Sequence, residues 1–178
     1  MKKFFLLFLA LGAAAFAGEN IKTPKQVWEK TVALKLNTSK VFTQEECNLT
    51  WEYIKKVPAK GDVDYFYKNM TYLLYFDLCR VEYNTPQYNE YHDWAQSVIP
   101  PEERDHFTGE CRKMEYKMLD ATEKVAFNLE AFNKTQNVGF LQLAEDYRRI
   151  MQLTAMMLNA SCSAQMSAET KRTLGLLR

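Results

Sequence analysis

The sequence has little glycine and proline, with 6 Gly and 5 Pro among 178 residues. Average usage is about 7% Gly and 5% Pro, and the scarcity excludes a collagen-like rod, a disordered low-complexity chain and a turn-rich β-sandwich. An excess of one charge is also lacking, because 23 Lys and Arg balance 22 Asp and Glu. A near-neutral chain offers no broad basic surface, so we expect no nucleic-acid partner.

Residues that carry catalysis are scarce as well. Only two His and five Ser are present, and no Ser lies in a Gly-x-Ser-x-Gly elbow. The sequence has no glycine-rich phosphate loop, and its four Cys are too far apart for a Cys-x-x-Cys metal unit. The pair His92-Asp93 has no nucleophile with a recognisable signature beside it. We therefore expect no enzyme activity, no metal and no cofactor.

The longest apolar run lies at the start of the chain. It follows Lys2 and Lys3 and ends in the small-x-small sequence Ala15-Phe16-Ala17. These are the parts of a secretory signal peptide, and the run is shorter than the roughly 20 residues that span a membrane. We predict that residues 1–17 are removed and that residues 18–178 form a single secreted domain without a membrane span. An uncleaved anchor is the alternative.

Asn-x-Ser/Thr sequons are more frequent than chance predicts. Composition alone accounts for about one such acceptor in a chain of this length, which makes N-glycosylation and a eukaryotic secretory pathway the favoured interpretation. The five acceptors are Asn37, Asn48, Asn69, Asn133 and Asn159.

The four cysteines predict two disulfides. An even number of Cys in an exported chain is typical of a disulfide-linked fold, and four Cys allow three pairings. Pairing of neighbours, Cys47 with Cys79 and Cys111 with Cys162, is our preference. If successive long helices alternate in direction, however, all four Cys lie at one end of the bundle and every pairing is allowed.

Apolar residues recur at helical spacing, and no segment shows the sustained alternation of a β-strand. Thr-Pro at 23–24 and at 85–86, and the capping box from Thr43 to Glu46, mark helix starts. The predicted fold class is all-α, an antiparallel helical bundle with two disulfides. Its four main helices cover residues 44–57, 63–83, 102–133 and 140–160, with shorter ones over 24–35, 86–98 and from Ser167.

Tyrosine is abundant between residues 63 and 94, and we do not expect all of these rings to face one core. Because Tyr is enriched at protein interfaces, we interpret them as a partner-binding face. The alternative is that the helix over 86–98 packs over residues 63–83 and buries them. The candidate face consists of Tyr65, Tyr72, Tyr75, Tyr88 and Tyr91.

Methionine gathers on the last two long helices. Met is flexible and polarisable, which suits a site for varied apolar ligands, and filling of the bundle core is the alternative. The candidate lining residues are Phe66, Met70, Met114, Met118, Met151 and Met157.

The function we predict from these features is extracellular protein–protein binding by a secreted, N-glycosylated helical protein. Such a protein would act as a signalling, immune or host-interaction factor on a partner that the sequence does not identify. The alternative function is a carrier of a lipid or other hydrophobic small molecule.

Overall fold

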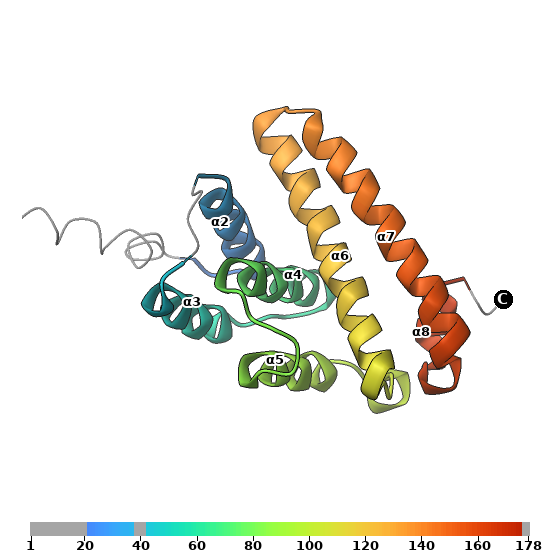
Figure 1. Ribbon diagram of the computed structural model, residues 1–178. Coiled ribbons are helices and arrows are strands. Elements are labelled where there is room, and N and C mark those ends of the chain that lie inside the picture. Colours follow the sequence, from blue (N-terminus) through green and yellow to red (C-terminus); the bar gives the residue numbers. More distant parts are fainter. Residues whose placement is uncertain (1–20, 38–41, 176–178) are drawn as a thin grey trace, which may run out of the picture. The chain divides into compact units, whose positions relative to one another are not determined.

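The computed structural model describes residues 21–37 and 42–175, which form helices joined by short loops (Figure 1). The described residues contain no strand, which confirms the all-α prediction, and the predicted signal peptide lies outside them. No described helix is long and apolar enough to cross a membrane. The α-helices are α2 (Pro24–Asn37), α3 (Gln44–Lys56), α4 (Asp62–Cys79), α5 (Pro86–Ser97), α6 (Gly109–Thr135), α7 (Gly139–Cys162) and α8 (Ala168–Thr173), with 3₁₀ turns η1 (Pro101–Glu103) and η2 (Ser163–Gln165).

The chain divides into two compact units, with the boundary after Val81. The first unit contains α2, α3 and α4, and the second contains α5 to α8. The four predicted main helices correspond to α3, α4, α6 and α7. Each unit closes one disulfide, Cys47–Cys79 in the first and Cys111–Cys162 in the second, so the predicted pairing of neighbours is confirmed.

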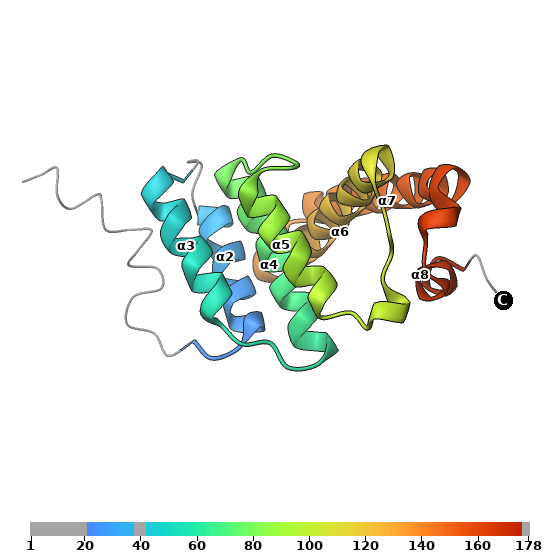
Figure 2. The same ribbon diagram turned by 90° about the horizontal axis from the view of Figure 1, so that it is seen from below.

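In the first unit, α2 and α3 both pack against α4 (Figure 2). The Trp51 ring of α3 lies among aromatic rings of α4, with centroids 5.1 Å from Tyr72 and 5.3 Å from Tyr75. Val27, Trp28 and Val32 of α2 are buried as well. Lys35 of α2 forms an ion pair with Asp77 of α4.

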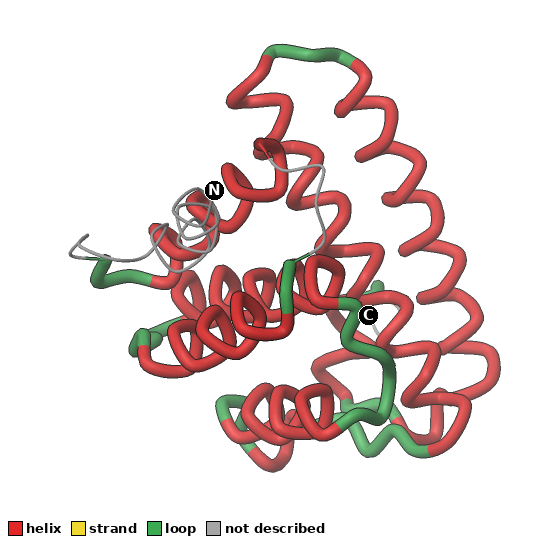
Figure 3. Tube along the Cα trace, turned by 60° about the vertical axis from the view of Figure 1, so that its left-hand side comes forward, coloured by secondary structure: helices red, strands yellow, loops and turns green. Residues whose placement is uncertain are grey.

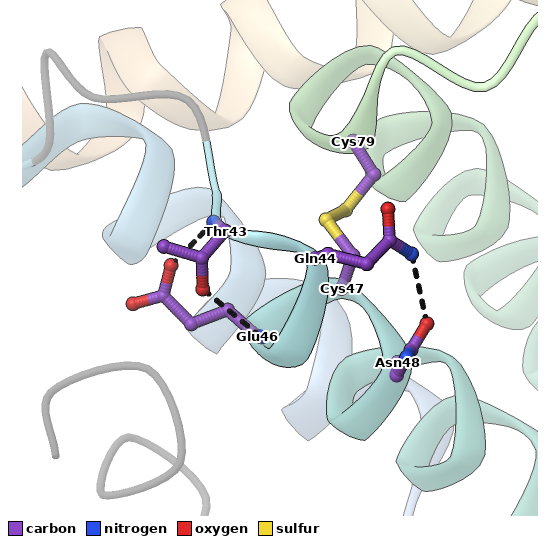
Figure 4. The surroundings of a disulfide bond; sticks show 6 residues. All are labelled: Thr43, Gln44, Glu46, Cys47, Asn48 and Cys79. Atoms are coloured by element: carbon purple, nitrogen blue, oxygen red, sulfur yellow. Dashed lines mark hydrogen bonds between the residues drawn. A yellow bond between two sulfur atoms is a disulfide. The ribbon is translucent and has the colours of Figure 1, made fainter. Parts of the chain in front are cut away.

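The start of α3 is fixed by its cap and by the disulfide beside it (Figure 4). The Glu46 backbone N–H donates to the Thr43 hydroxyl, and the Thr43 backbone N–H donates to the Glu46 carboxylate at 2.7 Å. This is the predicted capping box, and it satisfies two backbone donors that a helix start otherwise leaves unpaired. At the other end of α3, the buried Lys68 ammonium donates to the carbonyls of Lys55 and Val57.

In the second unit, α6 and α7 form a long antiparallel pair (Figures 1 and 3). Gln136 ends α6 in the left-handed conformation, and its backbone N–H donates to the Phe132 carbonyl at 2.7 Å. The Asn137 side chain then accepts from the Gly139 backbone N–H at the start of α7. A connection this short holds consecutive helices antiparallel.

The opposite end of the α6–α7 pair is held together by the disulfide and by hydrogen bonds, which we call the clasp. The Asp105 carboxylate accepts from the Ser167 backbone N–H at 2.7 Å and from the Thr170 hydroxyl at 2.8 Å. The His106 backbone N–H donates to the Gln165 carbonyl at 2.8 Å. These contacts join the segment before α6 to the segment after α7. A small apolar core surrounds the disulfide here, formed by Phe107, Leu158 and Met166 with the two cysteines.

The predicted start of the longest helix at residue 102 is wrong. After η1 the chain is extended at Arg104, and α6 begins only at Gly109, whose φ of +53° suits glycine. Residues 105–108 use their backbone N–H groups and the Asp105 side chain to reach Gln165, Ser167 and Thr170. Tertiary hydrogen bonds therefore override the local helical pattern.

Removing the Cys111–Cys162 disulfide should destabilise the second unit strongly. The bond links residues separated by 51 positions, and in the chain-entropy model this corresponds to about 4 kcal/mol of unfolding free energy. We expect the double variant Cys111→Ala/Cys162→Ala to lose about this much in urea denaturation followed by circular dichroism. An unchanged transition midpoint would contradict the clasp described above.

Candidate functional site

Helix α7 buries one side and exposes a row of large apolar residues on another. Leu143, Ile150, Leu153 and Met157 are between 46% and 61% exposed. At 100° per residue, these four positions fall within about 80° around the helix, so they form one strip, here called the outer row. The exposed Asp146 lies in the same sector, between Leu143 and Ile150. The buried side holds Ala144, Thr154, Leu158 and Cys162.

The spacing of the outer row is that of a helix-packing seam. Steps of seven, three and four residues separate Leu143, Ile150, Leu153 and Met157, as at the a and d positions of a heptad. Such a strip is typical of a helix face that packs against another helix. The sequence prediction of a helix over residues 140–160 missed this row. A search for heptad spacing on the outer side would have found it.

A second apolar surface lies between α6, α7 and the residues that end α8. It is a groove of about 850 Å³, here called the methionine groove. That volume lies within the roughly 300–1,000 Å³ of small-molecule sites. The groove is lined by Met118, Thr122, Met151, Gln152, Ala155, Met156, Asn159, Thr173 and Leu174.

The predicted apolar lining is brought together only in part. Met118 and Met151 line the methionine groove, and Met156 joins them. Met114 instead packs against the core around the Cys111–Cys162 disulfide. The other three predicted lining residues do not line this groove: Met157 is exposed in the outer row, and Phe66 and Met70 belong to α4 of the first unit.

The predicted tyrosine face is wrong for four of its five residues. Tyr72 and Tyr75 are 3% exposed and pack on Trp51, while Tyr88 and Tyr91 are 1% and 2% exposed. The Tyr88 ring lies 5.0 Å from the ring of Tyr116 on α6. Each unit therefore uses its own tyrosines as core. Tyr65 alone among the five is half-buried.

The α5–α6 packing encloses a cluster of ionisable groups. The His92 Nε2 atom lies 3.9 Å from Oε2 of Glu115, and the Arg112 guanidinium lies 5.6 Å from the centre of the Tyr88 ring. Among the described residues, no hydrogen-bond partner reaches Glu115 Oε2 or Arg112 Nε. A buried carboxylate oxygen that accepts no hydrogen bond is costly, so this cluster disfavours the charged form of Glu115.

The pKa values of this cluster follow from burial. Burial, with a smaller contribution from the Asp105 charge, raises the pKa of Glu115 from 4.5 to about 7, although the Arg112 charge opposes this. Burial and the Arg112 charge lower the pKa of His92, and the neighbouring Asp93 opposes that shift. Near pH 6.5 the cluster therefore favours a protonated, neutral Glu115 carboxyl group beside a neutral His92 imidazole.

The described sequon asparagines all lie on helices. Asn37, Asn48 and Asn133 are exposed, and Asn69 and Asn159 are half-buried. The residues that complete the first sequon, Thr38 and Ser39, lie outside the described residues. Asn159 differs from the other four acceptors in lining the methionine groove.

Glu115→Gln should change the pH dependence of stability. The unfolded chain releases the Glu115 proton near pH 4.5 but the folded chain keeps it to about pH 7, so this group lowers the unfolding free energy progressively as pH rises through that window. Relative to the native protein, the variant should gain up to about 3 kcal/mol at pH 8 and almost nothing at pH 4.5.

Urea denaturation at a series of pH values measures this difference. Glu110→Gln is the matched control, because the Glu110 side chain is 79% exposed on the same helix. If the unfolding free energy of Glu115→Gln depends on pH in the same way as that of the native protein, Glu115 ionises in the folded protein without loss of stability.

Comparison of this chain with protein families, with curated proteins and with solved structures gives no match. The described residues hold no group of three or more His, Cys, Asp or Glu able to bind a metal ion. The outer row of α7 and the methionine groove are the candidate sites that we identify on the second unit. Both are apolar, and both suit binding.

Proposed function

We propose that this chain is a secreted protein that acts by binding another extracellular protein through the outer row of α7. The observation that carries the proposal is the exposure of Leu143, Ile150, Leu153 and Met157 along one strip of a helix whose other side is buried. Isolated apolar residues on a surface need no explanation, whereas neighbouring exposed apolar residues, such as Ile150, Leu153 and Met157 here, mark an interaction site.

The shape of the outer row indicates what kind of partner fits it. A heptad-like row of aliphatic and methionine side chains packs into the holes of a facing helix or into an apolar groove. Asp146 lies within the row, between Leu143 and Ile150, and Arg149 lies beside it. Both are exposed, so the row combines apolar and charged side chains, as is typical of protein interfaces. The partner element that fits is therefore an amphipathic helix or an apolar groove.

Secretion is supported by independent features of the chain. Both pairs of cysteines form disulfides, as in proteins of oxidising compartments. The start of the sequence has the three parts of a signal peptide, and the sequons exceed chance. Together these features favour an extracellular partner.

The carrier function has one observation in its favour, the methionine groove with Met118, Met151 and Met156 in its walls. Its volume suits a small apolar molecule. Delipidated protein that binds no fluorescent fatty acid would reject this second function. Tight binding that is lost on Met151→Glu would support it.

The outer row should tolerate truncation, unlike the core beside it. Leu153 is 61% exposed and Leu158, five residues later on α7, is 0% exposed. We expect Leu153→Ala to change the unfolding free energy by less than about 0.5 kcal/mol, and Leu158→Ala to lower it by about 2–5 kcal/mol. If urea denaturation shows that both variants lose the same unfolding free energy, Leu153 belongs to the core.

Photo-crosslinking tests the partner directly. A benzophenone side chain at position 153, in protein incubated with the extracellular fluid in which it occurs, should form an adduct with one other protein. The same side chain at Arg148, which is exposed on the other side of α7, is the control and should form none. Native protein should compete for the adduct, whereas Ile150→Lys should compete at least about tenfold less well.

Two results would overturn the proposal. One is the absence of any adduct specific to position 153. The other is an adduct with a second copy of this chain, which would assign the outer row to a homodimer.

A further inference from the structure

The methionine groove contains the side chain of a sequon asparagine. Asn159 lines the groove and is followed by Ala160 and Ser161, which complete the acceptor. Asn133, on α6, is exposed and does not line the groove. Of the two acceptors in the second unit, Asn159 is therefore the one whose attached sugar would lie directly against apolar side chains.

The geometry of α7 directs a group on Asn159 along the groove. Gln152, Ala155, Met156 and Asn159 follow the spacing i, i+3, i+4, i+7, which places them on one side of the helix. Side chains of a helix lean toward its N-terminus, so the Asn159 side chain leans over the turn that holds Ala155 and Met156. A substituent on its amide nitrogen is thereby carried into the groove, with Asn159 at its C-terminal end.

The groove walls match the chemistry of an N-acetylhexosamine. Met118, Met151 and Met156 supply flexible apolar surface for the C–H faces of the rings and for the acetyl methyl groups. Polar groups are interspersed among them, namely the Gln152 amide and the hydroxyls of Thr122 and Thr173. The volume of about 850 Å³ lies in the range of sites that hold small molecules.

We propose that Asn159 is N-glycosylated and that the first sugars of this glycan occupy the methionine groove as a fixed, intramolecular ligand. The proposal rests on the secretory route of the proposed function. It assigns the groove to the chain's own modification in place of a diffusible lipid.

The same geometry leaves the outer row accessible. Asn159 follows Ile150 by nine residues, which places the two about 180° apart around α7. The glycan therefore covers one apolar side of the helix while the opposite side stays available to a partner protein.

Methionine oxidation tests the proposal, because Met156 and Met157 are neighbours with different surroundings. They are 68% and 58% exposed, but Met156 lines the groove and Met157 belongs to the outer row. In protein secreted from glycosylating cells and treated with hydrogen peroxide, peptide mapping should show Met156 oxidised at least about threefold more slowly than in Asn159→Gln. Met157 should be oxidised at the same rate in both.

Two controls separate shielding from other causes. Asn133→Gln removes the other acceptor of the unit and should leave Met156 protected. Enzymatic removal of glycans from the folded native protein should restore rapid oxidation of Met156, which covers the case in which Asn159→Gln fails to fold.

Either of two results would overturn the inference: an unmodified Asn159 in secreted protein that carries glycans on Asn48 or Asn133, or equal Met156 oxidation with and without the Asn159 glycan. Absence of glycans from every acceptor would instead contradict the secretory route and, with it, the proposed function.

Discussion

The clasp between the start of α6 and the end of α7 is the constraint on which the second unit depends. The Cys111–Cys162 disulfide brings the two Cα atoms to 5.8 Å, and Asp105 adds hydrogen bonds to Ser167 and Thr170. The far end of the pair is held by a short turn. Because both ends are fixed, the rotation of α7 about its axis is fixed too. Leu158 therefore faces the core, and Leu153 faces solvent.

This rotation divides the apolar residues of α7 among three surroundings. One set fills the core around the disulfide, a second lines the methionine groove, and a third forms the outer row. Only the first set is needed for folding, since burial of apolar surface is what stabilises the unit. The other two sets leave apolar surface in contact with water, which is unfavourable unless something covers it. The proposed partner protein would cover the outer row, and the proposed glycan would cover the groove.

Much of the fold could be predicted from the sequence, because its signals are local. Caps at Thr43 and Thr85 and the helical spacing on either side of Asn137 correctly indicate the helices, and sequence proximity favours the observed disulfides. Two predictions that depend on the packing of other elements, the start of the longest helix and the tyrosine face, were wrong. Residues 105–108 are not helical because Asp105, His106 and Thr108 form hydrogen bonds to the segment after α7. Tyr72 and Tyr88 are buried because Trp51 and Tyr116 lie against them. Periodicity shows which residues share a side of a helix, but it does not show whether another element covers that side.

Hydroxyl-radical footprinting of α7, with and without the extracellular fluid in which the protein occurs, measures whether a partner covers the outer row. We expect rapid modification of Leu153 and Met157 in the isolated protein, slow modification of Leu158, and protection of Leu153 and Met157 once the fluid is added. Protection of Leu153 equal to that of Leu158 in the isolated protein would contradict the exposure of the outer row. If adding the fluid does not change the modification of Leu153 and Met157, this would contradict the role of the outer row as a binding surface.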